Sequence, residues 1–362
     1  MGLINLSLSN APLIVHLITS AFLSLLLCLN APSIGSALGL IDDPKAKAHS
    51  LHLRTTPLVG GIAVLLPSGI LTGGDAILVR LSSQTGDVAR LHGWFALFIL
   101  AIALVGALDD RFHLTARLRL AVMGLMFMLF VSFNSAFGVA YLTLPAIGIS
   151  VSLGLLSVPF TAVCLLAFTN AVNMTDGRNG LTIGLSVIWC LTFSFYVPAD
   201  LRVTLYAVTA SLLVTGFYNL KGRLFLGDSG TYGLAALVGL TGLYAHGIGS
   251  GAGGVSSTQL ATIFAIPGLD MFRLIADRVS FGVSPMAGDH DHLHHRLERF
   301  IGWRLGLPVY LALAGAPILI ACSGPRMGTP GLIAAIVSYG AAWLVTRRYR
   351  QYPDLSGGRQ TG

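Results

Sequence analysis

Long apolar stretches recur along the chain, separated by short polar segments. The hydrocarbon core of a bilayer is about 30 Å thick, and a helix needs roughly 20 mostly apolar residues to cross it. Stretches of this kind make up most of the chain, so the pattern predicts an all-α polytopic membrane protein with about eleven transmembrane helices. The predicted spans cover residues 11–30, 58–74, 94–108, 118–133, 152–172, 181–198, 202–219, 231–248, 257–276, 305–322 and 329–346.

One apolar segment does not fit a helix. Residues 139–151 form a short stretch that alternates in places between apolar and polar positions and is interrupted by Pro145 and Gly148. These features are typical of a small extended hairpin. We therefore expect a β-hairpin outside the bilayer at 139–151, and the side on which every later loop lies depends on this interpretation.

Composition and charge agree with this picture and orient it. Of the 362 residues, 54% are hydrophobic and 10% are charged, against about 25% charged in soluble domains, which excludes a soluble protein. With the hairpin outside, 18 of the 22 Lys and Arg residues fall on one face, whereas a twelfth span would divide them 14 to 8. Because Lys and Arg favour cytoplasmic loops, we expect the N-terminus outside and the C-terminus in the cytoplasm. The net charge of +7 lies in these short loops and does not indicate nucleic-acid binding.

The chain shows no sign of a second domain. We expect one integral membrane catalytic domain over residues 1–346 and a polar cytoplasmic tail over 347–362. The first apolar run lacks a basic flank and a small-residue cleavage site, so it is interpreted as a retained span rather than a signal peptide. The four cysteines lie in apolar stretches without metal-ligand spacing and are interpreted as packing residues.

The acidic residues are unusual in kind and in place. Fourteen of the 15 are Asp, and twelve of the 15 fall on the predicted cytoplasmic face. A single loop Asp is often only a helix cap or a turn residue. Short Asp carboxylates gathered at the ends of spans are instead typical of a site for a hard divalent cation, since Mg²⁺ takes one or two carboxylates together with phosphate and water oxygens.

Two acidic segments stand at the ends of predicted spans. Asp109 and Asp110 directly follow the third span, and adjacent carboxylates repel unless a cation or a base offsets them. Arg117 and Arg119, further along, are candidate phosphate clamps, although anchoring at the bilayer surface explains them equally well. Asp228, in FLGDSGTYG, marks the mouth of the eighth helix, where it either caps the helix or accompanies N–H groups that bind a phosphate.

Two further segments suit a nucleotide sugar or a charged head group. In NAVNMTDGRNGLTIG, Asn173, Asp176 and Asn179 are interleaved with glycines, which let a ligand approach the backbone. The amides offer paired donors and acceptors to a planar base or a sugar. The first loop adds the basic residues Lys47 and His52, which serve equally well as contacts to anionic lipid head groups.

Four of the ten histidines lie within six residues, in SPMAGDHDHLHHRLER. The segment does not match the zinc pattern HExxH and has no Cys nearby, so zinc is the less favoured interpretation. Imidazoles beside phosphates, as donors or as acid–base groups, explain the cluster better. The four are His290, His292, His294 and His295.

In this order, the GALDDRF, DGxxGL, GDSG and HxHH segments together resemble the polyprenyl-phosphate N-acetylhexosamine-1-phosphate transferase family, to which the phospho-MurNAc-pentapeptide translocase is related. The likeness runs from about Asp42 to Leu297. GALDDRF and HLHH are most similar to the undecaprenyl-phosphate GlcNAc-1-phosphate transferase branch. The resemblance implies an eleven-helix bundle with a cytoplasmic active site and a small external hairpin.

The resemblance also implies a reaction. A sugar-1-phosphate, GlcNAc-1-phosphate in this branch, passes from a UDP-N-acetylhexosamine to undecaprenyl phosphate, UMP leaves, and the lipid-linked product starts O-antigen or another envelope glycan. The expected cofactor is Mg²⁺, with Mn²⁺ as an alternative, and the expected location is the bacterial cytoplasmic (inner) membrane. Membrane lipids are the other expected partners, nucleic acid is not expected, and a homodimer is left open.

By position, the resemblance assigns roles to individual residues. Asp109, Asp110, His292, His294 and His295 would be catalytic. Asp228, together with Asp109 and Asp110, would hold the metal. The substrate-binding set would be Asn173, Asp176, Asn179, Lys47, His52, Arg117 and Arg119.

Three positions depart from the family's pattern, and two other functions compete. Asn179 stands where a second Asp is usual, and His49 and His290 stand where Arg is common, which would weaken the fixed positive field around a phosphate. A secondary transporter would use acids near mid-bilayer, for which Asp270 is the best candidate. An intramembrane metallohydrolase would need a general base within the histidine cluster, and Glu298 lies outside it.

Overall fold

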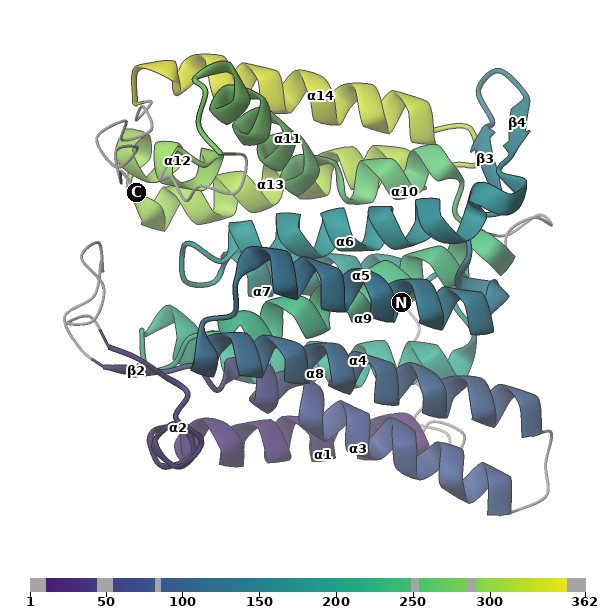
Figure 1. Ribbon diagram of the computed structural model, residues 1–362, viewed down its shortest axis with the longest axis vertical. Coiled ribbons are helices and arrows are strands. Elements are labelled where there is room, and N and C mark those ends of the chain that lie inside the picture. The colour runs from purple at the N-terminus through teal and green to yellow at the C-terminus, as the bar shows by residue number, and fades with distance from the viewer. Residues whose placement is uncertain (1–10, 44–54, 82–85, 249–253, 285–290, 350–362) are drawn as a thin grey trace, which may run out of the picture. The chain divides into compact units, whose positions relative to one another are not determined.

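The computed structural model describes residues 11–43, 55–81, 86–248, 254–284 and 291–349 (Figure 1). These ranges are mostly helical, and their strands form only small two-stranded sheets, which confirms the predicted fold class. The helices are α1 Ala11–Leu29, α2 Ala31–Leu38, α3 Gly60–Leu81, α4 Gly86–Phe112, α5 Ala116–Phe133, α6 Ser157–Thr175, α7 Leu181–Phe193, α8 Ala199–Leu220, α9 Gly227–Ile248, α10 Ser257–Ile263, α11 Ala265–Ser280, α12 Leu293–Ile301, α13 Trp303–Cys322 and α14 Gly328–Val345. The strands are β1 Ile41–Asp42, β2 Thr56–Pro57, β3 Tyr141–Leu144 and β4 Ile149–Ser152.

A helix, or a pair of helices with a bend between them, lies at each position where the apolar pattern predicts a span. By length and composition, six of the described helices can cross a membrane, or up to eight if each bent pair is one span. Shorter apolar helical stretches of 10–17 residues cover Gly60–Gly74, which is the first part of α3, and Leu181–Phe193. The number of eleven spans stays a prediction.

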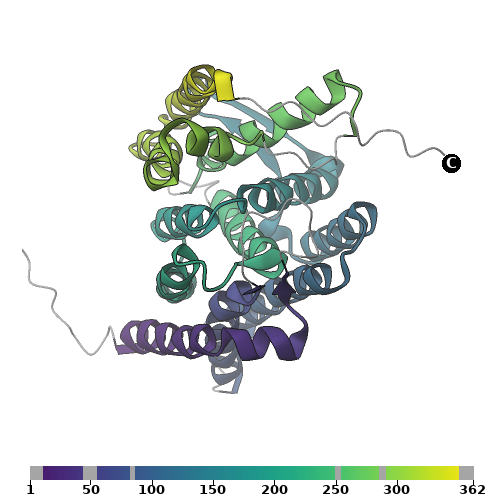
Figure 2. The same cartoon turned by 90° about the vertical axis from the view of Figure 1, so that its left-hand side faces the viewer.

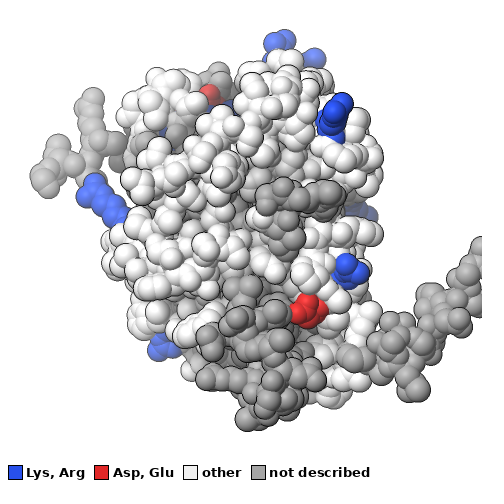
Figure 3. All heavy atoms as spheres, turned by 90° about the vertical axis from the view of Figure 1, so that its right-hand side faces the viewer, with Lys and Arg blue, Asp and Glu red and all other residues white. Residues whose placement is uncertain are grey.

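Large apolar side chains cover much of the described surface. Phe133, Phe195 and Leu319 are each at least 76% exposed. Apolar surface left in water costs about 25 cal/mol per Å², so a surface of this kind needs lipid around it. Figure 3 shows one face on which charged side chains are scattered singly among uncharged residues. Together with the apolar helices, these features identify a multi-pass membrane protein.

The segment at 139–151 forms the predicted hairpin. Strands β3 and β4 pair antiparallel, with Tyr141 opposite Ser152 and Leu144 opposite Ile149. The turn between them contains Gly148 with a φ of +68°, a conformation that glycine adopts without strain. The backbone N–H of Thr143 donates to Ser257 Oγ at 2.8 Å, which ties the hairpin to the start of α10.

The chain divides into two compact units. The first comprises Met1–Met123 and Ser186–Thr241, and the second comprises Gly124–Leu185 and Gly242–Gly362. Two helices of the first unit, α1 and α2, meet at a bend of 69°, so that Figure 1 shows α1 from the side but looks along α2. Pro32 stands in the first turn of α2, where its missing N–H is not needed. The apolar pattern had assigned this short helix to a loop.

In the first unit, α3 packs against α1, α4 and α8. The start of α3 is fixed by the segment that precedes α9, because the N–H groups of Gly60 and Gly61 donate to Phe225 O and Leu226 O, each at 2.9 Å. A Cβ at Gly61 would lie 2.2 Å from the backbone nitrogen of Gly230. Glycines at this contact therefore let α3 approach the first turn of α9 closely.

In the second unit, α13 packs beside α14, and α10 contacts both (Figures 1 and 2). The single span predicted at 257–276 is two helices, α10 and α11, which bend by 73° at Phe264. Pro267 in the first turn of α11 lacks the N–H that a continuous helix would use. Gln259 anchors α10, since its side chain completes a capping box with Ser256 and donates to Ala321 O at 2.9 Å.

Candidate functional site

In the first unit, a carboxylate of α4 caps the start of α9. Asp110 Oδ1 accepts the backbone N–H of Asp228 at 3.0 Å, and its Oδ2 accepts that of Ser229 at 3.2 Å. Helix N-termini attract negative charge because their first N–H groups lack intrahelical partners. Two of the N–H groups that the sequence offered to a phosphate are thus bound to Asp110.

Glycine makes this approach of α4 and α9 feasible. A Cβ at Gly106 would lie 2.2 Å from the backbone oxygen of Asp228, and one at Gly227 would lie 2.7 Å from Asp110 Oδ2. Gly227 also has a φ of +72°, in the left-handed region that favours glycine. The contact therefore requires that both positions lack a side chain.

The other carboxylate of the pair has different partners. Asp109 is buried, and its Oδ2 accepts hydrogen bonds from Arg119 Nη1 at 2.9 Å and from the Tyr232 hydroxyl at 2.8 Å. Arg119 of α5 therefore offsets the charge of the pair, while Arg117 is exposed on the same helix. Tyr232, in the first turns of α9, was not predicted as a site residue, and its place in the GDSGTY segment was the signal available.

The cluster gathers three carboxylates. Asp110 lies close enough to Asp109 and Asp228 for their charges to interact, and the Arg119 guanidinium is hydrogen-bonded to Asp109. Among the described residues, no group of three or more His, Cys, Asp or Glu is arranged to hold a metal by itself. Mg²⁺ commonly takes one or two carboxylates and completes its shell with phosphate and water oxygens, and two carboxylates are what Asp228 and Asp110 would supply to such an ion.

In the second unit, three imidazoles pack together around the start of α12. The rings of His292 and His294 are stacked with centroids 5.2 Å apart, and those of His294 and His295 lie 4.2 Å apart. His294 is fully buried, and neither of its ring nitrogens has a hydrogen-bond partner. Burial, followed by the neighbouring His292 and His295, lowers the pKa of His294 well below 6.5, so its ring is neutral at neutral pH.

The glycine-rich segment lies against this histidine cluster. A Cβ at Gly177 would lie 2.4 Å from His294 Nε2 and 3.2 Å from His295 Nε2. Arg178 forms an ion pair with Glu298 of α12, and Trp303 Nε1 donates to Asn179 O at 3.0 Å. Two of the segments singled out in the sequence are therefore brought together within one unit.

The amide and acid of this segment lie at the end of α6. Asn173 is in the last turn of α6, and its backbone oxygen accepts the N–H of Asp176, which follows the helix, at 3.1 Å. Thr175 between them donates to Val172 O and lies 3.2 Å from the Thr182 hydroxyl of α7. These contacts fix the backbone of the predicted nucleotide-sugar segment.

A buried ion network supports the histidines, and its members were missed as site residues. Asp270, which the sequence offered only to a transporter, accepts hydrogen bonds from His292 Nδ1 at 3.0 Å and from Arg273 Nη2 at 3.2 Å. Asp291 accepts from Arg273 Nη1 at 3.1 Å and from Arg296 Nε at 2.9 Å. The sequence feature that could have revealed these residues is the concentration of Asp and Arg in and after the predicted span at 257–276.

Some predicted residues lie outside the described chain. These are Lys47 and His52 of the first loop, and with them the departures His49 and His290. Their assignments to the substrate stay predictions. The carboxylate cluster belongs to the first unit, and the histidine cluster with the glycine-rich segment belongs to the second.

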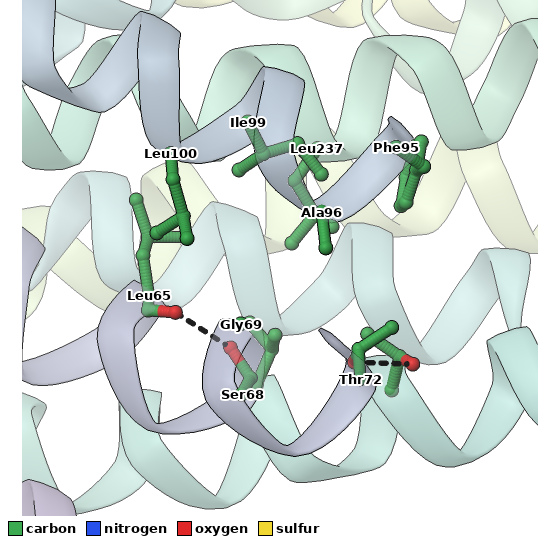
Figure 4. Close-up of a pocket in the computed structure, with 11 residues that line it drawn as sticks. Leu65, Ser68, Gly69, Thr72, Phe95, Ala96, Ile99, Leu100 and Leu237 are labelled. Atoms are coloured by element: carbon green, nitrogen blue, oxygen red, sulfur yellow. Dashed lines mark hydrogen bonds between the residues drawn. The ribbon is translucent and has the colours of Figure 1, made fainter. Parts of the chain in front are cut away.

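A crevice in the first unit is a poor candidate for the reaction. It lies among α3, α4, α8 and α9 and is lined by apolar and hydroxyl side chains without an ionisable group (Figure 4). Its hydroxyls bond within the fold, Ser68 Oγ to Leu65 O at 3.2 Å and Thr72 Oγ1 with Thr204 Oγ1 at 3.0 Å. These side chains pack against one another, and none of them carries a charge that could bind a phosphate or assist phosphoryl transfer.

Comparison with known proteins bears on the chemistry of these clusters. Residues 93–246 match the model of glycosyl transferase family 4. The matched range contains Asp109, Asp110, Asp176 and Asp228, and it ends before the histidine cluster. Both units thus contribute residues to the matched range.

Relatives of known name align along most of the chain. A probable undecaprenyl-phosphate N-acetylglucosaminyl 1-phosphate transferase of Bacillus subtilis (strain 168) is 26% identical over 299 residues, which are 80% of this chain and 78% of that protein. A decaprenyl-phosphate N-acetylglucosaminephosphotransferase of Mycobacterium tuberculosis (strain ATCC 25618 / H37Rv) is 28% identical over 358 residues, 89% of this chain and 87% of that protein. An undecaprenyl-phosphate alpha-N-acetylglucosaminyl 1-phosphate transferase of Escherichia coli (strain K12) is 28% identical over 312 residues, 81% of this chain and 77% of that protein.

These matches confirm the resemblance drawn from the sequence motifs, and they favour an enzyme over the transporter and metallohydrolase alternatives. The chain is therefore a membrane enzyme that matches the model of glycosyl transferase family 4 over residues 93–246 and is similar along most of its length to polyprenyl-phosphate N-acetylglucosamine-1-phosphate transferases.

Proposed function

We propose that this enzyme transfers N-acetylglucosamine-1-phosphate from UDP-N-acetylglucosamine to undecaprenyl phosphate and releases UMP. Relatives named as undecaprenyl-phosphate N-acetylglucosaminyl 1-phosphate transferases align over about four-fifths of the chain. The observation that carries the proposal is the cluster of Asp109, Asp110 and Asp228 at the meeting of α4 and α9. Carboxylates gathered in this way suit a reaction between two phosphorylated substrates and a divalent ion.

The proposed reaction depends mainly on positioning and on charge neutralisation. Asp228 and Asp110 would hold Mg²⁺, or Mn²⁺ in its place, and the ion would neutralise the charge that develops on the donor diphosphate. The lipid phosphate attacks the sugar-bearing phosphorus, and UMP leaves. Because the lipid phosphate is already anionic at neutral pH, neither Asp109 nor Asp110 has to remove a proton. Asp109 keeps Arg119 beside the reacting groups through their ion pair.

The amides and imidazoles singled out in the sequence would contact the nucleotide sugar. Asn173, Asp176 and Asn179 would bind the base and the sugar, and His292 and His295 would contact phosphate or sugar oxygens. The neutral ring of His294 would pack between its neighbours rather than add a positive charge. Lys47, His52 and Arg117 would add basic contacts to the phosphates or to lipid head groups.

We further propose that the active site faces the cytoplasm of a bacterial inner membrane, with the N-terminus outside and the C-terminus inside. The 18 to 4 division of Lys and Arg supports this orientation. A cytoplasmic site would give access to a soluble nucleotide sugar, and the lipid-linked product would start O-antigen or another envelope glycan.

The test is direct transfer by the purified protein. With Mg²⁺, undecaprenyl phosphate and labelled UDP-N-acetylglucosamine, we expect a labelled lipid product and UMP in equal amounts, and none after chelation of the metal. Asp228→Asn should abolish turnover, while Arg348→Ala, near the end of the described chain, should leave it unchanged. A panel of UDP-sugars then identifies the preferred hexosamine. Near-normal turnover in Asp228→Asn would refute the metal assignment.

A further inference from the structure

Asp270 of α11 is a buried acid of the second unit, 2% exposed, and it accepts hydrogen bonds from several elements. Besides His292 and Arg273, the Tyr339 hydroxyl donates to its Oδ1 at 2.9 Å. The backbone N–H of Leu293 lies 3.2 Å from each of its two oxygens. Donors therefore reach this carboxylate from α11, α12 and α14.

These donors determine which ring nitrogen of His292 carries the proton. Paired with the Arg273 guanidinium, Asp270 is an ionised carboxylate, which accepts hydrogen bonds and cannot donate one. Nδ1 of His292, 3.0 Å from Asp270 Oδ2, must then be the donor. A neutral ring with a proton on Nδ1 has its lone pair on Nε2, so the carboxylate leaves Nε2 as the nitrogen available to a ligand.

The same carboxylate also holds the backbone at this point. His292 immediately precedes α12, and Leu293 is the first residue of that helix. Because Asp270 accepts both the ring N–H of His292 and the main-chain N–H of Leu293, it fixes the position of the ring and the start of α12 together. Either bond alone would leave the ring free to turn or the helix end free to shift.

Asp270 itself is held rigidly by Arg273. The Nε of Arg273 donates to the Tyr339 hydroxyl at 3.0 Å, and its Nη2 donates to the main-chain oxygen of Asp291 at 2.6 Å. Asp291 is bound in turn by Arg296, whose side chain is fully buried. A carboxylate fixed in this way transmits its geometry to His292 instead of adjusting to it.

We propose that Asp270 is a positioning residue for His292, which fixes the Nδ1–H form of the ring and directs the lone pair of Nε2 to a hydroxyl group of the nucleotide-sugar donor, which donates the hydrogen bond. The proposal rests on the proposed function, because the use of Nε2 requires a sugar nucleotide at this cluster. Asp270 itself touches no substrate. Its effect on turnover must therefore pass through the histidine.

The kinetic test compares Asp270→Asn, His292→Asn and the double variant in the transfer assay. We expect Asp270→Asn to lower kcat/KM about 10- to 100-fold, as loss of an acid that orients a histidine ligand typically does. In the His292→Asn background, the same change should lower it less than about twofold further, because residues that act as one unit are not additive. Asp277→Asn is the matched control, since Asp277 also pairs with Arg273 from α11 but does not bond His292.

Equal fold-losses in the two backgrounds would overturn the proposal, because Asp270 would then act independently of His292. Asp277→Asn should stay within about twofold of wild type. If it matches Asp270→Asn, the general ion network is responsible and the proposal again fails.

A measurement on the wild-type chain keeps the proposal testable if Asp270→Asn does not fold. In ¹⁵N-histidine-labelled protein at neutral pH, the ring signals that vanish in His292→Asn identify His292. We expect them to show a proton on Nδ1, and a ring protonated only on Nε2 would overturn the proposal. A protein that shows the Nδ1–H ring but no sugar-phosphate transfer would refute the proposed function while leaving the Asp270–His292 geometry intact.

Discussion

Gly106→Ala tests whether the carboxylate cluster depends on direct backbone contact between α4 and α9. The added Cβ would lie 2.2 Å from Asp228 O, 2.4 Å from the carbonyl carbon of Asp228 and 2.5 Å from the backbone nitrogen of Ser229. Ordinary contacts of a Cβ begin near 3.4 Å, and these neighbours are backbone atoms that cannot rotate away. The helices must therefore separate by about 1 Å, which would stretch the bonds from Asp228 and Ser229 to Asp110, now 3.0 and 3.2 Å long.

Two effects should follow from this displacement. Overpacking of this kind costs about 1–3 kcal/mol of folding free energy, and a shift of about 1 Å at a reacting centre can lower the rate about 100-fold. We expect Gly106→Ala to fold with a reduced unfolding temperature and to lose most of its transfer activity.

The assay pairs detergent-solubilised thermal unfolding with labelled sugar-phosphate transfer. Gly73→Ala in α3 is the matched control, because nothing lies within 4 Å of its added Cβ and alanine is the better helix former. It should be as stable as wild type or slightly more stable, with normal activity. A Gly106→Ala enzyme that behaved like Gly73→Ala would refute the inference that the site requires this close approach.

Three further predictions concern single side chains. Tyr232→Phe removes the 2.8 Å bond to buried Asp109 and should cost about 1–3 kcal/mol of unfolding free energy, a loss absent from the Asp109→Ala background; additive losses would show that the hydroxyl acts elsewhere. Gly177→Ala places a Cβ 2.4 Å from His294 Nε2 and should reduce transfer more than Gly268→Ala, which meets nothing within 4 Å; equal activities would contradict contact with the histidine cluster. Because burial lowers the pKa of His294 well below 6.5, the unfolded chain binds more protons than the folded chain below pH 6.5. The stability that the neutral, buried His294 ring contributes to the folded chain is therefore fully present above about pH 6.5 and is lost as the pH falls. The unfolding temperature of wild type should drop between pH 7 and pH 5 more than that of His294→Phe, and parallel curves would exclude this effect.

Sequence reasoning succeeded where each residue reports on its own surroundings. A helix in lipid must be apolar over its length, so spans could be recognised one at a time, and the broken alternation around Pro145 and Gly148 predicted the hairpin that β3 and β4 form. The sequence also predicted one continuous helix at 257–276, but the structure has two helices there, with Pro267 beside the bend at Phe264. Apolar content alone does not reveal such a break, since both halves are equally apolar.

Within the site, the sequence identified the residue types but not their partners. It treated Asp109 and Asp110 as one acidic pair that a nearby base could offset, whereas the fold gives Asp109 to Arg119 and Tyr232 and gives Asp110 to the start of α9. It predicted that the free N–H groups at the start of α9 could bind a phosphate, whereas two of these groups donate to Asp110. These bonds join residues 10 to 123 positions apart, and no local pattern specifies them.

By itself, the sequence determined that this chain lies in a membrane, where its helices fall, and which carboxylates, amides and imidazoles can do chemistry, because hydropathy and residue type are local properties. Only the tertiary structure decided how those groups are held. The cap that Asp110 provides, the hydroxyl of Tyr232 on Asp109 and the carboxylate of Asp270 on His292 exist because separate helices approach until their side chains touch. That approach depends on glycines and buried ion pairs whose partners are distant in the chain.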